Sequence, residues 1–178
     1  MKTICIGISA AISAMTIPSY ILMLKAKYNN VKIKVIMTSN SQYFLSPGAV
    51  KHLPNVIVYE SMTDLTDKGL SHISLVADLD LFIVSPATAN FLGKAANGLA
   101  DDILSLCYLS AECKKIILPA MNSAMYKNKA VCRNLEQVKT DGAHVLEPSV
   151  GLSAQSGDKG IGAICSPSKL ISLIERLS

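Results

Sequence analysis

Small, hydroxylated and amide-bearing residues gather at four places where an apolar run of the sequence ends. Backbone N–H groups and Ser or Thr hydroxyls in such places suit an anionic phosphate, and small side chains let a flat ring approach the backbone. Any strand-to-helix turn uses the same residue types, so one segment alone would indicate only a turn. Four together favour a cofactor site, and they are residues 7–13, 38–41, 85–90 and 119–122.

The sequence lacks the common signatures of nucleotide and metal sites. Neither G-x-G-x-x-G nor G-x-x-x-x-G-K-[ST] occurs, which argues against an NAD enzyme of the usual type and against an NTPase. The five cysteines form no C-x-x-C pair and no Cys/His spacing of the zinc type, so we predict no metal site. We interpret them as reduced thiols of a cytoplasmic protein.

One of the three histidines is placed for acid–base chemistry. His72 lies at the predicted start of a short helix just before a buried strand, where an imidazole that titrates near neutral pH could face the cofactor. His52 lies in a predicted loop and His144 starts a predicted strand, so we expect a solvated and a structural role for them. Position alone leaves a catalytic and a structural role open for His72.

Apolar runs of strand length alternate along the chain with segments of helix length. The predicted strands are residues 3–8, 32–37, 56–59, 79–84, 115–118 and 144–146. Helical patterns cover residues 14–27, begin again at about 100, and end the chain after Pro167. This alternation predicts an α/β fold, a Rossmann-like or flavodoxin-like parallel sheet with helices on both faces. Ligands of such sheets bind at the carboxyl ends of the strands, where the four segments lie.

Composition restricts the class of protein. The chain has 178 residues and a formal net charge of +4, and 50% of its residues are hydrophobic and 17% charged, so it can bury a core. Its lysines form no basic block with aromatics, which argues against a nucleic-acid partner.

No residue between Lys2 and Lys25 is charged, as in a membrane span or signal peptide. Gly7 and Pro18 interrupt that run, so we expect strand, turn and helix there and no membrane association.

Three motifs in order, with a histidine before them, carry a family resemblance. They are P-A-T-A-N at residues 86–90, A-N-G-L-A-D at 96–101 and P-A-M-N-S-A-M-Y at 119–126, preceded by His72-Ile73. The chain resembles the homo-oligomeric flavin-containing cysteine decarboxylases from its first strand to about Gly162. That family includes phosphopantothenoylcysteine decarboxylases and the epidermin- and mersacidin-type lantibiotic peptidyl-cysteine decarboxylases. The resemblance implies one flavoprotein domain over residues 1–178.

The resemblance implies a cofactor and a set of site residues. FMN would be held by Ser9, Ala10, Ser13, Ser39, Ser41, Phe44, Ser85, Pro86, Ala87, Thr88, Ala89 and Asn90. Ala11 departs from the family's frequent G-S-I loop, and Ser13 is the hydroxyl that could compensate. The catalytic histidine falls on His72, and Asn122 would hold the substrate carboxylate beside Met121 and Met125. FMN would oxidise the Cα–Cβ portion of a cysteine, after which loss of CO2 gives an enethiol.

One position in the resemblance bears on the substrate. In phosphopantothenoylcysteine decarboxylases, a cysteine of an A-C-G-D-x-G-x-G segment protonates the enethiol; in the matching residues 155–162 that position is Ser156. A hydroxyl is a poor proton donor, so we expect the reaction to end at the enethiol, on a precursor peptide with a C-terminal cysteine. Ser156 would then lie near the substrate. Cys165, just beyond the segment, stays open as an alternative donor.

Two other functions stay open. They are phosphopantothenoylcysteine decarboxylation in coenzyme A biosynthesis and a non-catalytic role as a flavin-binding regulatory subunit.

The Gly- and Ser-rich residues 148–165 contain no predicted element, and we expect them to form a mobile loop that covers the substrate. The family also implies a homo-oligomer, a trimer or a dodecamer of four trimers, with FMN between subunits.

Overall fold

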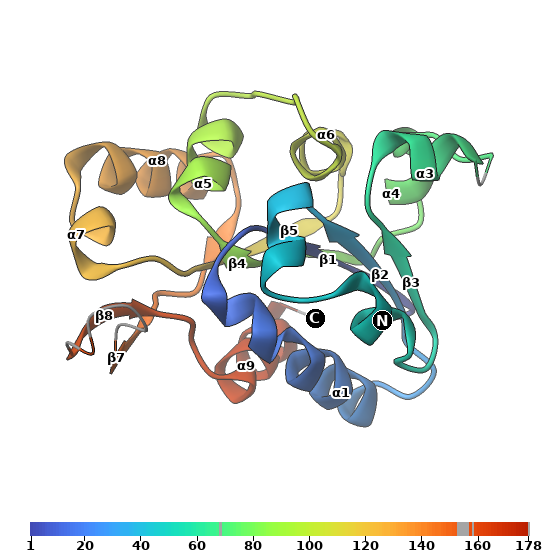
Figure 1. Ribbon diagram of the computed structural model, residues 1–178, viewed down its shortest axis with the longest axis horizontal. Helices are drawn as coiled ribbons and strands as arrows, with labels where there is room; N and C mark the ends of the chain where they lie inside the picture. Colours follow the sequence, from blue (N-terminus) through green and yellow to red (C-terminus); the bar gives the residue numbers. More distant parts are fainter. Residues whose placement is uncertain (68, 153–156, 158, 178) are drawn as a thin grey trace.

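A six-stranded parallel sheet forms the centre of the computed structural model, which describes residues 1–67, 69–152, 157 and 159–177 (Figure 1). Its strand order is β3-β2-β1-β4-β5-β6. The strands are β1 (Thr3–Ile8), β2 (Lys32–Met37), β3 (Val56–Tyr59), β4 (Leu81–Ala87), β5 (Lys114–Pro119) and β6 (His144–Val145). The predicted α/β class is confirmed, and the first three strands have the predicted bounds.

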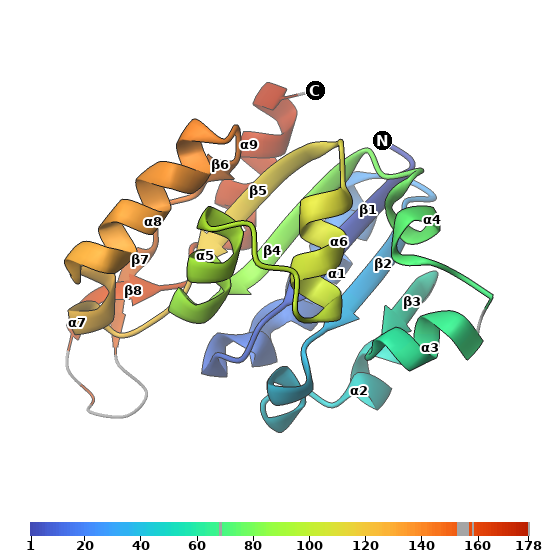
Figure 2. The same ribbon diagram turned by 90° about the horizontal axis from the view of Figure 1, so that it is seen from above.

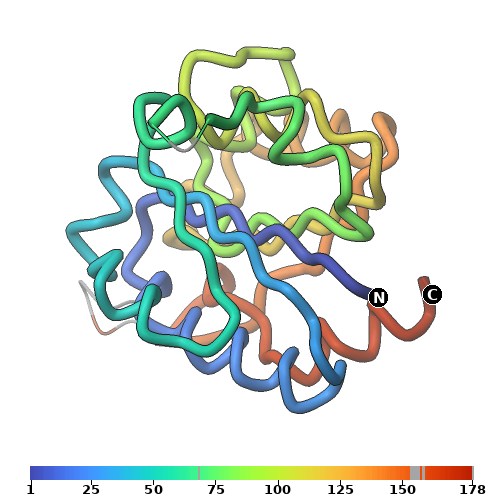
Figure 3. Tube along the Cα trace, turned by 90° about the vertical axis from the view of Figure 1, so that its right-hand side faces the viewer, coloured from blue at the N-terminus to red at the C-terminus, as the bar shows by residue number. Residues whose placement is uncertain are grey.

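Helices cover both faces of this sheet. In Figure 3 the blue and red helices α1 and α9 lie below the strands, and green and yellow helices lie above them. The first face carries α1 (Ile17–Lys27), α2 (Pro47–Lys51) and α9 (Pro167–Leu177). The second carries α3 (Met62–Asp67), α4 (His72–Val76), α5 (Ala89–Ala96), α6 (Ile103–Ser110) and α8 (Lys129–Thr140). The short helix α7 (Ser123–Tyr126) follows β5.

Strand β1 shows why its sequence is a continuous apolar run. All of its residues are buried. Ile4, Ile6 and Ile8 pack into the core on the α1 and α9 side, whereas Cys5 packs into the core on the α6 side. Gly7 also faces α6, because a Cβ at this position would lie 2.2 Å from Leu104 Cδ1. Because both faces of the strand are covered, its sequence does not alternate between apolar and polar residues.

Several element boundaries differ from the prediction, three of them by a clear local cause or a longer extension. The helix expected over residues 14–27 begins as a 3-10 helix, Ile12–Thr16, and becomes α1 at Ile17, with proline in its first turn. The helix expected from about residue 100 begins at Ile103, because Asp102 Oδ1 accepts a hydrogen bond from Ser105 N at 2.8 Å. Strand β4 continues to Ala87, through a cis peptide bond before Pro86.

The uncharged N-terminal run is strand, turn and helix, as expected. Within the part of the chain that the structure describes, no helix has the length and apolar character needed to cross a membrane.

Residues 148–165, expected to lack regular elements, contain an antiparallel hairpin. Its strands are β7 (Ser149–Leu152) and β8 (Lys159–Ala163), which pair only with each other in the described residues. Both strands are short, rich in glycine and only partly buried, so neither an apolar run nor a clear alternation marks them in the sequence. The hairpin lies beside α7 (Figures 1 and 2).

Candidate functional site

A serine and a threonine join the carboxyl ends of the two central strands. Ser9, directly after β1, donates its hydroxyl to Pro86 O at 2.7 Å and accepts a hydrogen bond from Thr88 N at 2.9 Å. Thr88 in turn caps α5, because its Oγ1 accepts a hydrogen bond from Phe91 N at 3.3 Å. Ser9 and Thr88 are thus side by side, and the Ser9 hydroxyl already serves to hold the two strand ends together.

Two other hydroxyls at this edge are buried without a partner. Among the described residues, nothing forms a hydrogen bond with Ser13 Oγ or with Ser85 Oγ, and Ser85 is only 1% exposed. An unpaired buried hydroxyl costs about 1–3 kcal/mol, so folded proteins rarely keep one without a reason. Both belong to segments predicted to hold the cofactor, and a bound group with hydrogen-bonding atoms would satisfy them. The residues at this edge therefore fit an anionic, polar cofactor such as a flavin mononucleotide.

The loop after β2 divides into buried and exposed members. Ser41 is fully buried, and its Oγ donates to Thr38 O at 2.6 Å, so this hydroxyl closes its own turn. Thr38 N donates to Ile8 O at 3.1 Å and attaches the loop to β1. Ser39 and Phe44 are exposed, which leaves them accessible to a ligand at the same edge.

The remaining predicted cofactor residues belong to β4, α5 and the first loop. Pro86 and Ala87 are buried at the end of strand β4. Ala10 and Ala89 are partly buried, and Asn90 is exposed at the start of α5. Pro86 and Ala87 have no hydrogen-bonding side-chain atoms, so they would contribute shape and backbone.

Asn122 keeps its amide N–H groups available. Its Oδ1 accepts a hydrogen bond from Met125 N at 2.8 Å and so caps α7, and no described residue accepts a hydrogen bond from its Nδ2. A neutral N–H donor of this kind suits a carboxylate. Ala120 N donates to Ala87 O at 3.0 Å, which places the 119–122 segment next to the end of β4. Met121 is partly buried and Met125 is exposed beside Asn122.

The two cysteine-related predictions have different outcomes. Ser156 lies outside the described residues. Cys165 is 1% exposed and packs into the core between α1 and α9, and burial raises the pKa of its thiol. A thiol that is buried and hard to ionise is a poor participant in proton transfer to a bound substrate. Cys165 therefore offers no accessible thiol to a substrate within one chain.

His72 does not lie near Asn122 within one chain. It is the first residue of α4, and Ser71 caps this helix by accepting a hydrogen bond from Ser74 N at 3.1 Å. Helix α4 packs against α6, and α4 and α7 lie at opposite ends of the long axis of the molecule (Figures 1 and 2). The histidine and the asparagine predicted to act on one substrate are therefore separated by α5 and α6.

Lys34 is a buried charge near His72 that the sequence analysis missed. Its Nζ donates to Leu75 O at 2.6 Å, at the end of α4, and forms an ion pair with Asp78. Burial alone would raise the pKa of Asp78, but the hydrogen bond and the charge of Lys34 outweigh burial and lower it. The signal in the sequence is a lysine at an inward position of a strand whose other inward residues are apolar.

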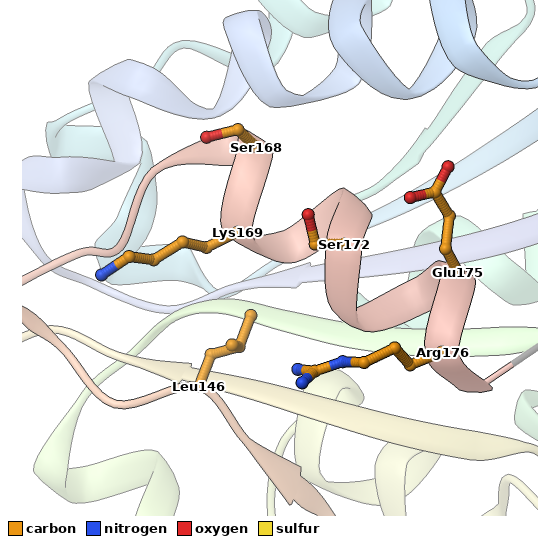
Figure 4. A pocket seen from close by; sticks show the side chains of 6 residues that line it. All are labelled: Leu146, Ser168, Lys169, Ser172, Glu175 and Arg176. Carbon is orange, nitrogen blue, oxygen red and sulfur yellow. The ribbon is translucent and has the colours of Figure 1, made fainter.

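A cavity in the described residues lies elsewhere. It has a volume of about 580 Å³ between the end of β6 and α9, and its lining residues are Leu146, Ser168, Lys169, Ser172, Glu175 and Arg176 (Figure 4). Figure 4 shows that all of these side chains except Leu146 come from α9, and Glu175 points away from Leu146 and forms an ion pair with Lys27 of α1. None of the predicted site residues lines this cavity.

Comparison with known proteins identifies the family. The family model described as Flavoprotein matches residues 1–178. The chain belongs to the flavoprotein family. This confirms the predicted family and its flavin cofactor. The chain is a flavoprotein related to decarboxylases, as three relatives show.

The relatives of this flavoprotein include two kinds of decarboxylase. The coenzyme A biosynthesis bifunctional protein CoaBC of Bacillus subtilis (strain 168) is 40% identical over 145 residues, which cover 81% of this chain and 36% of CoaBC. Mersacidin decarboxylase of Bacillus sp. (strain HIL-Y85/54728) is 33% identical over 147 residues, 83% of this chain and 74% of that protein. The crystal structure of the FMN-dependent cysteine decarboxylase SpaF has a TM-score of 0.85 and 30% identity, covering 100% of this chain and 98% of SpaF.

This flavoprotein spans only part of the CoaBC relatives. It covers between 36% and 43% of the CoaBC proteins of Bacillus subtilis (strain 168) and Vibrio vulnificus (strain YJ016). The similarity to CoaBC therefore concerns one portion of a bifunctional protein.

Proposed function

We propose that this flavoprotein is an FMN-dependent decarboxylase that converts the C-terminal cysteine of a precursor peptide to an aminoenethiol. The observation that carries the choice of substrate is the burial of Cys165, combined with serine at position 156. Neither position supplies an accessible thiol to protonate the enethiol. The product therefore stays an enethiol, and the reaction is a net oxidation. The five cysteines are all free, which supports a reducing compartment such as the cytoplasm.

The residues of this chain have separate tasks in that reaction. FMN, when bound, supplies the acceptor for two electrons. The unpaired hydroxyls of Ser13 and Ser85 would hold it. Asn122 would orient the substrate carboxylate through Nδ2 without a positive charge, which matters because a cation would stabilise the carboxylate more than the transition state of CO2 loss. His72 would accept the thiol proton.

We propose that a complete site takes residues from more than one copy of the chain. His72 at α4 and Asn122 at α7 lie at opposite ends of the molecule, so a single copy cannot present both to one cysteine (Figure 2). We propose a homo-oligomer, a trimer or a dodecamer of four trimers, in which α4 of one copy lies against the carboxyl edge of another.

Phosphopantothenoylcysteine is the second candidate substrate, and the 40% identity to CoaBC favours it. The two candidates differ in their products. We would incubate the purified holoprotein with a Cys-terminated peptide and, separately, with phosphopantothenoylcysteine, and measure CO2 and products. Enethiol formation from the peptide alone supports the proposal. Formation of pantetheine phosphate, with the peptide unchanged, would assign the protein to coenzyme A biosynthesis.

A further inference from the structure

Helix α7 connects Asn122 to strand β8 of the hairpin. The residues on either side of Asn122 both form hydrogen bonds with β8: Met121 N donates to Gly162 O at 3.1 Å, and Ser123 Oγ donates to Ile161 O at 2.8 Å. One of these bonds is made by backbone alone. The other depends on the side chain of Ser123, so residue 123 is the position at which a substitution can loosen β8 without altering Asn122.

Two glycines of β8 permit this close contact. A Cβ at Gly162 would lie 2.0 Å from Met121 O, and a Cβ at Gly160 would lie 2.7 Å from Ser123 Oγ. Gly162 also has a φ of +137°, which L side chains rarely adopt. Only glycine fits at these two positions while β8 stays against the Asn122 segment.

The chain just before the other strand of the hairpin, β7, is attached to the same helix. The Tyr126 hydroxyl donates to a carboxylate oxygen of Glu147, just before β7, and Lys139 Nζ pairs with the other oxygen at 3.1 Å. Burial raises the pKa of Glu147, but the bonds to Tyr126 and Lys139 outweigh it and lower the pKa, which keeps this carboxyl ionised. Helix α7 thus contacts the chain on both strands' sides of the open end of the hairpin, and Asn122 caps the start of this helix.

We propose that Ser123 is a positioning residue for substrate binding: its hydrogen bond to Ile161 O fixes the hairpin relative to the Asn122 amide. This inference rests on the proposed role of Asn122 as the carboxylate donor. A substrate held by Asn122 would lie next to the hairpin, because the residues before and after Asn122 both form hydrogen bonds with β8. Loosening β8 would therefore weaken substrate binding more than the chemical step.

The test compares Ser123→Ala, which removes the bond, with Ser123→Thr, which keeps a hydroxyl. Ser110→Ala is the matched control, because Ser110 Oγ also donates to a backbone carbonyl, Leu106 O at 2.9 Å, but on α6. With a Cys-terminated peptide, Ser123→Ala should raise KM about five- to tenfold, the loss of one hydrogen bond, and change kcat less than twofold. Ser123→Thr should restore KM, and flavin content and Tm should match the wild type in all three variants.

Amide hydrogen exchange tests the contact without turnover. The Met121 amide, which donates to Gly162 O, should exchange faster in Ser123→Ala than in the wild type and in Ser110→Ala. If wild-type protein acts on no cysteine substrate, the proposed function fails, and the exchange rates still decide whether Ser123 holds the hairpin. Unchanged KM and unchanged Met121 exchange in Ser123→Ala would overturn the inference. A fall in flavin content or Tm that Ser123→Thr does not restore would also overturn it.

Discussion

At the scale of single residues, we expect Ser85 to contact the cofactor. Its hydroxyl and that of Ser13 are buried at the carboxyl edge without partners among the described residues. Tyr28 OH also lacks a hydrogen-bond partner among the described residues, but Tyr28 directly follows α1, outside the segments predicted to hold the cofactor. Ser13 and Ser85 are predicted cofactor contacts, whereas Tyr28 has no predicted function. Tyr28 can therefore serve as the control for an unpaired hydroxyl.

Ser85→Ala should separate cofactor binding from stability. Removing an unpaired hydroxyl leaves the stability of the flavin-free protein unchanged or raises it, whereas losing a hydrogen bond to the cofactor weakens flavin affinity about five- to tenfold. Flavin fluorescence titration and thermal melts of the flavin-free protein measure the two effects. Tyr28→Phe is the control and should leave flavin affinity unchanged. Equal flavin affinity in Ser85→Ala and the wild type would contradict the assignment.

His72→Asn tests the acid–base residue directly. Asparagine keeps hydrogen-bonding atoms but cannot take up a proton near neutral pH, so decarboxylation should fall at least about a hundredfold. The visible flavin spectrum should be retained, because no predicted cofactor contact is changed. CO2 release measures decarboxylation, and the absorbance spectrum of the same preparation shows whether flavin is still bound. Turnover at the wild-type rate would exclude a catalytic role for His72.

Some site residues could be predicted from the sequence, and others only as members of a segment. Asn122 was predicted from its motif, but its capping of α7, which occupies Oδ1 and leaves Nδ2 available, depends on the backbone geometry. Ser9 and Ser41 were predicted as cofactor contacts, yet their hydroxyls hold Pro86 O and Thr38 O. A serine in a turn can bind a ligand or its own backbone, and sequence alone does not distinguish the two.

At the scale of elements, strands were easier to predict than the hairpin. Strands β1, β2 and β3 are read from their apolar runs because both faces of the sheet are covered. In the hairpin, β7 and β8 each pair with only one strand in the described residues, and their faces are partly exposed. Gly162 allows a close contact with Met121, a residue that is far from it in the sequence. That contact depends on the tertiary structure, so no local pattern indicates it.

Lys34 anchors the element that carries His72. Lys34→Met should destabilise the protein by about 1–3 kcal/mol, because the hydrogen bond to Leu75 O and the partner of Asp78 are lost together. Urea unfolding at neutral pH measures this change. Lys25→Met is a suitable control, since Lys25 Nζ also donates to a carbonyl, Val31 O at 3.1 Å, but at the surface side of α1. Equal stability of Lys34→Met and the wild type would contradict an anchoring role.

The pH dependence of this ion pair has a defined sign. The pKa of Asp78 is lower in the folded protein than in the unfolded chain. The ionised carboxyl therefore stabilises the folded protein fully above the ordinary carboxyl pKa of about 3.9, and this stabilisation is lost as the pH falls through the pKa of the folded protein. The stability difference between the wild type and Asp78→Asn should therefore shrink below about pH 4. A difference that is constant from pH 7 to pH 2 would show that the ion pair does not contribute.

At the scale of the whole molecule, the separation of α4 and α7 leads us to predict a site shared between two copies of the chain. Two inactive variants, His72→Asn and Asn122→Asp, should restore activity when mixed within one oligomer, because each supplies what the other lacks. Asn122→Asp keeps the oxygen that caps α7 but replaces the amide donor with a negative charge. For a site that takes one residue from each of two copies, random mixing of equal amounts gives about one quarter of the wild-type sites.

Co-refolding of the two variants followed by an activity assay measures this restoration. Mixing the separately folded oligomers without exchange of subunits is the control and should stay inactive. If co-refolded mixtures show no activity while each variant binds flavin and forms the wild-type oligomer, His72 and Asn122 do not meet between copies.

The most direct test of the proposed oxidative decarboxylation follows peptide and flavin together without oxygen. One equivalent of a Cys-terminated peptide is mixed anaerobically with the holoprotein, while flavin absorbance near about 450 nm and the peptide mass are recorded. The proposal predicts that the peptide loses about 46 Da, which is CO2 and two hydrogens, as the flavin is reduced in equal amount. A loss of about 44 Da with the flavin still oxidised, or an unchanged peptide, would contradict it.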